Sequence, residues 1–250
     1  MKGIICIPMS GSDPVLDYSH LRNEVTNLAA SYRVAEPFPH IVLDGFLSPA
    51  IIAELNSQFP DTSRAQEVVA GGEVMQRGKE WVSGDRFLPL LFRRLFWEMN
   101  FYPFVDFLEN LTGIAGLLAD PHHFGGGVQS IAPGGFLKLH TDFNKHPDFD
   151  LDRRVNVYIY LNENWLPEYG GALELWSKNL DQCVKSIAPL AGRCVVFSSS
   201  VNFWHGHPQP LACPPDRRRR SLALYYYTNG NPRAEDVGAC ETIWGTPRNY

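Results

Sequence analysis

The stretch LKLHTDF, from Leu137 to Phe143, combines strand-like alternation with two residue types that bind metal ions. Side chains at positions i and i+2 of a strand project from the same face, so the imidazole of His140 and the carboxylate of Asp142 converge. Two ligands do not complete a metal site. A facial triad of two histidines and one carboxylate needs a second histidine, which should come from a strand far along the chain.

Two histidines in the stretch FWHGHP, residues 203–208, are candidates for that ligand. His205 and His207 share a strand face, and the 65 residues from His140 to His205 (205 − 140) suit one circuit of a jelly roll. The strand should end near Pro208, because proline restricts the residue before it. We therefore expect His205 to be the ligand and keep His207 as the alternative. Such a triad leaves positions open for oxygen and a co-substrate at a non-heme Fe(II) ion.

Short β-rich runs separated by Gly and Pro turns fill the chain from about residue 122 onward. Many short strands at this spacing are typical of a sandwich or jelly roll. We expect an α+β fold in which N-terminal helices pack against a double-stranded β-helix, or jelly roll. All 250 residues should form one domain, with helical support over about 1–120, the jelly-roll core over about 121–230 and a tail over 231–250. The predicted strands of the core are Val128–Ile131, Phe136–His140, Val155–Leu161, Ala172–Trp176, Cys183–Ile187, Cys194–Ser198 and Ser221–Thr228.

The first part of the chain carries helical signals. Ser48 followed by proline is typical of an N-cap and the first turn of a helix. A long apolar-periodic stretch over residues 87–113 is broken near Pro103, which predicts two helices there. Residues His40–Phe46 have the pattern of a strand. A further helix is predicted where apolar residues recur at helical spacing, at Leu21, Val25, Leu28 and Tyr32.

Composition limits the classes of function. Hydrophobic residues make up 44% and charged residues 20% of the chain, so disorder throughout is excluded. The net charge of −5 argues against a nucleic-acid or anionic-membrane binder, because both need a basic face. Five cysteines without a CxxC pair argue against a disulfide scaffold or zinc knuckle and favour the reducing cytoplasm. The apolar run near Met1 is too short for a signal peptide, and no apolar stretch reaches the roughly 18 residues of a membrane span.

A second cluster, RRSLALYYYT, starts at Arg219, 14 residues after His205 (219 − 205). On a strand, Arg219 and Ser221 share one face and Arg220 points away. A guanidinium binds carboxylates bidentately, so Arg219 could anchor a dicarboxylic co-substrate. The alternative is a solvated basic turn over residues 217–220. The position of Arg219 after the distal histidine and at the start of a strand favours the binding role.

Taken together, these motifs resemble the prolyl-4-hydroxylase-like branch of the 2-oxoglutarate/Fe(II) dioxygenases. The resemblance covers roughly residues 122–230 and extends to PFPHIVLDGF at residues 37–46. It rests on the spacing His-x-Asp, distal His and Arg-x-Ser. The supporting stretches are LKLHTDF (137–143), RVNVYIYLN (154–162), GGALELW (170–176) and FWHGHP (203–208).

The resemblance implies roles for particular residues. His140, Asp142 and His205 would hold Fe(II), and Arg219 with Ser221 would bind the distal carboxylate of 2-oxoglutarate. A tyrosine hydroxyl from the strand after the His-x-Asp motif would join them, and Tyr160 matches best. Asn156 and Tyr158 share the strand parity of Tyr160 and would line the same pocket. The alternative for the two tyrosines is an aromatic stripe that packs in the core. The cofactors implied are Fe(II), 2-oxoglutarate and O2, with ascorbate as a candidate addition.

The reaction implied is oxidation of a substrate C–H bond with decarboxylation of 2-oxoglutarate to succinate and CO2. Related radical halogenases lack the carboxylate of the triad, so the presence of Asp142 predicts hydroxylation. We expect a small molecule or carrier-linked metabolite as substrate. The alternatives are a prolyl or other side chain of a protein and, after that, a catalytically silent metal-binding jelly roll. No nucleic-acid or membrane partner is expected, and the oligomeric state is left open.

The polar loop over residues 143–153 is expected to be mobile without substrate. It is either a lid over the site or a plain solvated connection.

Overall fold

The computed structural model describes residues 14–62, 68–70, 72–231 and 238–247 of the chain. Within these residues, one sheet of twelve strands runs in the order β1-β9-β6-β11-β5-β10-β7-β8, and β2, β3, β4 and β12 pair at its sides. The strands are β1 (His40–Leu43), β2 (Val68–Ala70), β3 (Glu73–Val82), β4 (Leu118–Ala119), β5 (Gly127–Thr141), β6 (Asp152–Tyr160), β7 (Leu173–Trp176), β8 (Cys183–Ile187), β9 (Cys194–Ser198), β10 (His205–His207), β11 (Arg219–Thr228) and β12 (Ile243–Trp244).

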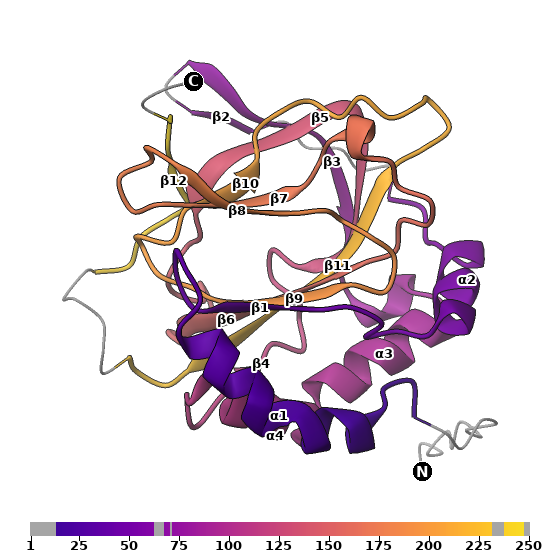
Figure 1. The fold of residues 1–250 in the computed structure, drawn as a ribbon, viewed down its shortest axis with the longest axis vertical. Helices are drawn as coiled ribbons and strands as arrows, with labels where there is room; N and C mark the ends of the chain where they lie inside the picture. The colour runs from indigo at the N-terminus through magenta and orange to yellow at the C-terminus, as the bar shows by residue number, and fades with distance from the viewer. Residues whose placement is uncertain (1–13, 63–67, 71, 232–237, 248–250) are drawn as a thin grey trace, which may run out of the picture.

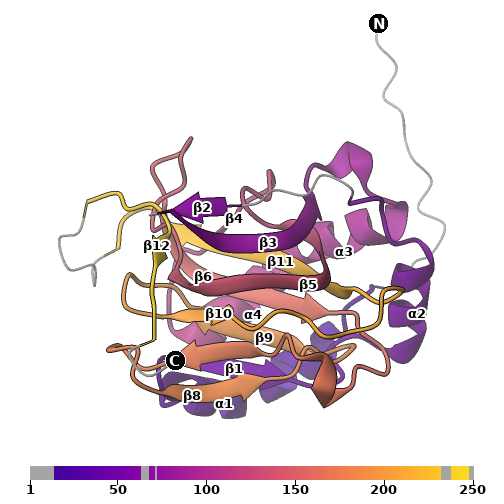
Figure 2. The same ribbon diagram turned by 90° about the horizontal axis from the view of Figure 1, so that it is seen from above.

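The named strands pair antiparallel, and most neighbours are not consecutive in the chain. Figure 1 shows the sheet folded into two layers, with β5, β10, β7 and β8 facing β11, β6, β9 and β1. Figure 2 shows the same strands from above, stacked side by side across the molecule. This is the predicted jelly roll with helices packed against it, and the fold class is confirmed.

The helices lie where the sequence predicts them. They are α1 (Tyr18–Arg33), α2 (Pro49–Ser57), α3 (Leu90–Asn100) and α4 (Tyr102–Thr112), with short 3-10 turns η1 (Asp85–Phe87) and η2 (Pro167–Tyr169). The Ser48 side chain accepts a hydrogen bond from the backbone N–H of Ile51 at the start of α2, as predicted. The predicted break between α3 and α4 falls at the extended residue Phe101, with Pro103 in the first turn of α4.

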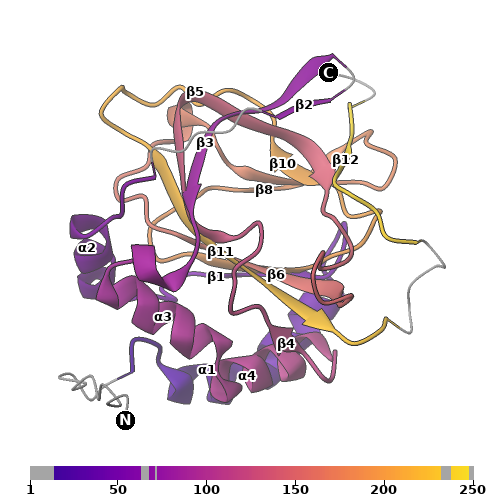
Figure 3. The same ribbon diagram turned by 180° about the vertical axis from the view of Figure 1, so that it is seen from behind.

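The helices cover one face of the sheet and leave the other face to the barrel interior (Figure 3). Along β11, Leu222, Leu224 and Tyr226 belong to the large core shared with the helices. The Tyr226 hydroxyl donates to the backbone carbonyl of Met99 in α3 at 2.8 Å. Successive strand residues point to opposite faces, so residues 221, 223 and 225 point into the barrel. Helix packing thereby fixes which β11 side chains line the site.

Two strands near the site differ most from the predictions. The runs at Val128–Ile131 and Phe136–His140 belong to one 15-residue strand, β5, which continues through the Pro-Gly-Gly segment. The strand β3, in the part expected to be helical support, pairs with β5 along most of its length. Its register shifts between Arg77 and Lys79, at Gly78 with φ +68°. This bulge breaks the two-residue period and hides the strand from a search for alternation.

The segment after β11 adds one short strand, β12. Within the expected tail, β12 pairs with β5 at Thr141 and His140. Four of the cysteines are free thiols, while Cys6 and the rest of residues 1–13 lie outside the described residues. In the described residues, no helix is both long and apolar enough to cross a membrane.

Burial predicts how much two leucines of the same helix contribute to the free energy of unfolding. Leu95 is 0% exposed and Leu90 is 54% exposed in α3. Leu95→Ala should lower the free energy of unfolding by about 2–5 kcal/mol, because it leaves a cavity between helix and sheet. Leu90→Ala should lower it by less than about 1 kcal/mol. Urea unfolding followed by circular dichroism measures both, and equal losses would contradict this description of the core.

Candidate active site

Three buried side chains form a candidate metal site at the end of β5. His205 of β10 lies directly opposite His140 of β5 in the strand register. The Oδ1 and Oδ2 atoms of Asp142 lie 3.8 Å from His140 Nε2 and 3.5 Å from His205 Nε2, respectively. One ligand atom from each residue falls within 4.8 Å of the others. The register places His207 opposite Leu137, and it is not a member of this cluster.

The two imidazoles are oriented by their other ring nitrogens. His140 Nδ1 donates to the Lys138 carbonyl at 2.9 Å, and His205 Nδ1 donates to the Phe203 carbonyl at 3.0 Å. These bonds leave the Nε2 lone pairs directed at Asp142. His205 Nε2 is buried without a hydrogen-bond partner. Burial lowers the pKa of both imidazoles, which keeps them neutral. An orphaned nitrogen among neutral imidazoles and a carboxylate fits a divalent metal such as Fe(II).

A buried arginine and an asparagine hold the carboxylate of the triad. Arg153 Nη2 lies 3.1 Å from Asp142 Oδ2, and Asn156 Nδ2 donates to the same oxygen at 2.7 Å. Arg153 Nε in turn donates to Asn156 Oδ1 at 2.9 Å. The guanidinium packs over the rings of Tyr225 and Phe143, at 3.5 and 4.5 Å from their centroids. Burial is the largest single influence on the pKa of Asp142 and raises it, but the Arg153 charge, the two imidazoles and the Asn156 hydrogen bond together lower the pKa. The carboxylate is therefore ionised and fixed in orientation.

The predicted co-substrate residues lie on the barrel interior next to this triad. Arg219 is 5% exposed, donates from Nε to the Gly171 carbonyl at 2.7 Å and from Nη2 to the Tyr160 hydroxyl at 3.4 Å. No carboxylate lies within ion-pair distance of its guanidinium in the described part of the chain. Ser221 and Tyr158 line the same cavity. Arg220 points away, as predicted, toward Asn56.

Asn156 takes a different place from the predicted one. It has the expected strand parity, but its side chain is fully buried behind the triad, against Asp142 and Arg153. It supports a metal ligand and is not part of the cavity wall. The sequence could not show this, because Arg153 lies at the end of the 143–153 loop. Its contact with Asp142 depends on the path of that loop between β5 and β6.

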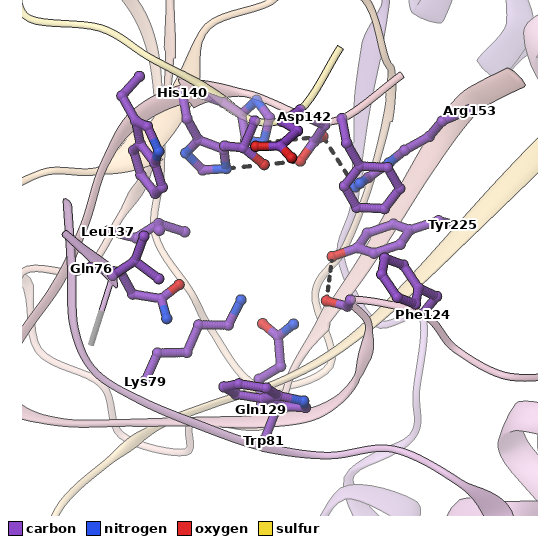
Figure 4. A pocket seen from close by; sticks show the side chains of 18 of the residues that line it. Gln76, Lys79, Trp81, Phe124, Gln129, Leu137, His140, Asp142, Arg153 and Tyr225 are labelled. Atoms are coloured by element: carbon purple, nitrogen blue, oxygen red, sulfur yellow. Dashed lines mark hydrogen bonds and ion pairs between the residues drawn. The ribbon is translucent and has the colours of Figure 1, made fainter. Parts of the chain in front are cut away.

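The triad and Arg219 face one cavity of about 910 Å³. Figure 4 shows His140 and Asp142 on one side of it, Arg153 and Tyr225 on the next, and Gln76, Lys79, Trp81 and Gln129 across from the triad. Trp244 of β12 also lines it, with its ring 5.2 Å from that of His140. The sequence does not reveal the β3 residues of this wall or Trp244, because neither β3 nor the two-residue β12 carries a recognisable pattern.

The loop after β5 makes contacts within itself. Lys145 pairs with Asp150 at 3.0 Å, and residues Lys145 and Asp152 form an isolated β-bridge. The ring of His146 stacks on Phe149 with centroids 4.6 Å apart. These contacts hold the loop beside the cavity, and its mobility without substrate stays a prediction.

A family model of the 2OG-Fe(II) oxygenase superfamily matches residues 126–227, which run from β5 to β11. Residues 126–227 form a 2OG-Fe(II) oxygenase domain. The chain therefore contains an oxygenase domain of the class that uses Fe(II), 2-oxoglutarate and O2, and its His-Asp-His cluster fits iron binding. The resemblance to the prolyl-4-hydroxylase-like branch is confirmed.

Solved structures with the same fold include proteins with different molecules bound. A prolyl-4-hydroxylase from Pseudomonas putida is 21% identical, with TM-score 0.54, over 80% of this chain and 98% of that one. A Trichoplax adhaerens prolyl hydroxylase, in complex with a hypoxia inducible factor peptide fragment, is 20% identical with TM-score 0.57, over 84% and 90%. HygX from Streptomyces hygroscopicus, with nickel, 2-oxoglutarate and hygromycin B bound, is 12% identical with TM-score 0.51, over 83% and 92%. A search of curated proteins finds no match.

The Arg153 contacts predict an effect on metal affinity. Arg153→Met should weaken Mn(II) binding by roughly 10- to 100-fold, because Asp142 loses the charge that holds it in place. Arg154→Met is the matched control: it also removes a buried arginine, but this one donates to Thr228 and not to the triad. Calorimetric titration of the folded variants with Mn(II) compares them. Equal affinities for the two variants would remove Arg153 from the metal site.

Proposed function

We propose that this oxygenase hydroxylates a C–H bond of a small molecule, with iron held by His140, Asp142 and His205. The observation that supports this best is the convergence of the three ligand atoms on a cavity that also holds a buried guanidinium, Arg219, with no carboxylate partner among the described residues. The same cavity provides both a metal site and a carboxylate site. A catalytically silent metal-binding module would not need the second of these.

The co-substrate is proposed to extend from the triad to Arg219. Its distal carboxylate would pair with the guanidinium, which Gly171 and Tyr160 already hold in one orientation. Ser221 stands two residues along β11 on the same face and offers a hydroxyl to the same carboxylate. The ammonium of a lysine would offer only a point charge here, whereas arginine offers a planar pair of donors.

The residues around the triad each have one role in the reaction. Bound Fe(II) with 2-oxoglutarate supplies the activation of O2, so that substrate C–H, O2 and 2-oxoglutarate become C–OH, succinate and CO2. The carbonyls of Lys138 and Phe203 hold the two imidazoles in the tautomer that presents Nε2. Arg153 and Asn156 hold Asp142 ionised. Since Asp142 supplies the carboxylate that radical halogenases lack, we expect hydroxylation and not chlorination.

Occupation of the β5 edge near the metal favours a small molecule over a peptide. Extended peptides commonly bind by adding a strand to an open sheet edge. Here Ile243 and Trp244 of β12 already pair with Thr141 and His140, and Gly245 donates to the Leu139 carbonyl at 2.9 Å. A peptide could not use this edge without displacing the C-terminal segment. A peptidyl substrate, as in the prolyl hydroxylase structures, is therefore the second choice.

The proposed ligand set predicts which histidine is essential. His140→Ala, Asp142→Ala and His205→Ala should each abolish Mn(II) binding and 2-oxoglutarate decarboxylation, since each removes one of three protein ligands. His207→Ala should retain Mn(II) binding. Calorimetry and succinate assays on the four variants measure this. Metal binding that survives in His205→Ala but fails in His207→Ala would exchange the two assignments.

A matched pair of arginines tests the co-substrate site. Arg219→Gln should weaken 2-oxoglutarate binding by about 2–4 kcal/mol, or roughly 30-fold or more, because a desolvated bidentate pair is lost. Arg220→Gln should change it by less than about threefold, because Arg220 packs over Phe59 on the other face. Titration of the Mn(II)-loaded proteins with 2-oxoglutarate gives both values. The same affinity in wild type and Arg219→Gln would overturn the site.

A further inference from the structure

Lys79 is a second cation on the wall that carries Arg219. In the strand register, Arg219 of β11 and Lys79 of β3 lie opposite the same residue, Ile131 of β5, from its two sides. Directly opposite residues project from the same face, so both cations point into the barrel. Two strand spacings separate them, about 10 Å. Figure 4 shows the Lys79 amino group directed into the cavity, between Gln76 and Gln129 and across from the metal ligands.

The Lys79 ammonium has no partner among the described residues. The described residues place no acceptor within hydrogen-bond or ion-pair distance of it, and its charged neighbours act at longer range. Burial lowers the pKa of Lys79 to about 8; Asp142 raises it, while Arg153 and Arg219 lower it further. The amine therefore keeps its proton at neutral pH. Lys79 is half-buried, and an ammonium that faces a cavity without a counter-ion is unfavourable, which is the state expected of a site that receives its anion from outside.

A neighbouring amide adds a second unused donor. Gln129 lies opposite Trp81 in β5, diagonally next to Lys79, and is 6% exposed. Its Nε2 atom is buried without a hydrogen-bond partner. An ammonium and one amide N–H group can satisfy a carboxylate, which has two oxygens and one charge. They would leave a phosphate dianion underpaired. The chemistry of the pair therefore selects a carboxylate.

The co-substrate does not account for this anion. 2-Oxoglutarate has two carboxylates: the proposed function assigns the distal one to Arg219 and the one next to the keto group to the metal. Neither carboxylate of 2-oxoglutarate is therefore available to pair with Lys79. We infer that Lys79, with Gln129 beside it, binds a carboxylate of the substrate that is oxidised, so that the substrate is a small free carboxylic acid. This inference rests on the proposed function.

The inference narrows the substrate class. An acid linked to a carrier through a thioester, or to a peptide through an amide, has no free carboxylate at the linked carbon. Free amino acids and other small organic acids therefore fit this cavity better than their linked forms. The substrate carbon to be oxidised would lie between Lys79 and the triad, on the opposite walls seen in Figure 4.

A panel of acids and matched amides tests this. The Mn(II)- and 2-oxoglutarate-loaded protein, which does not turn over, is titrated with the common amino acids, 2-hydroxy acids and straight-chain dicarboxylic acids, each beside its primary amide. At least one acid should bind, and its amide should bind roughly 10- to 100-fold more weakly. Lys79→Gln should weaken binding of that acid by a similar roughly 10- to 100-fold, while its affinity for 2-oxoglutarate stays within about twofold. With Fe(II) and O2, the same acid should stimulate succinate formation.

The controls separate this inference from its alternatives. Lys185→Gln removes an exposed lysine of β8 and should bind the acid as wild type does. Lys79→Gln and Lys79→Met remove an uncompensated charge, so neither should melt below wild type. Amides that bind as well as their acids, or a panel with no acid-selective binder, would overturn the inference. A loss of 2-oxoglutarate affinity in Lys79→Gln as large as that in Arg219→Gln would instead give Lys79 to the co-substrate. Wild-type protein that does not bind 2-oxoglutarate at all would contradict the proposed function itself.

Discussion

The pairing of His205 with His140 across β10 and β5 is the constraint on which the site depends. Directly opposite residues of an antiparallel pair have Cβ atoms about 4.5–5.5 Å apart, so both imidazoles can reach one ion. Their ring centroids lie 4.5 Å apart. A register slip of one residue would turn His205 to the other face of the sheet. The same register places His207 opposite Leu137, and this difference in position separates two histidines that the sequence alone leaves as competitors.

The strand β5 and its pairing partners position both the charged residues of the cavity and the metal ligands. Its neighbours β11 and β3 place Arg219 and Lys79 on the interior face, opposite Ile131. A third buried cation, Arg153, is neutralised by Asp142. The chain has a net charge of −5, yet its cavity holds two cations without acidic partners in the described residues. Cations without partners are unfavourable in the empty cavity and become favourable when anions bind. The charges of the site therefore favour anionic ligands.

The sequence predicted the parts of the structure whose patterns are local. Caps and apolar periodicity located α1, α2, α3 and α4, and β8 and β9 have the predicted bounds. The bulge at Gly78 hid β3, and with it Lys79 and Trp81, because the interior positions on either side of it are three residues apart. The role of Asn156 depends on Arg153, and their meeting with Asp142 is a long-range contact. No local pattern encodes such a contact.

We propose that this cavity couples O2 to the oxidative decarboxylation of 2-oxoglutarate. The most direct test exposes the anaerobic Fe(II)- and 2-oxoglutarate-loaded protein to 18O2 and measures the mass of the succinate by mass spectrometry. Conversion of the 2-oxo carbon into a carboxylate adds one oxygen atom, so we expect succinate with one 18O atom per molecule. Succinate without the label, or no succinate from the Fe(II)-loaded protein, would contradict it.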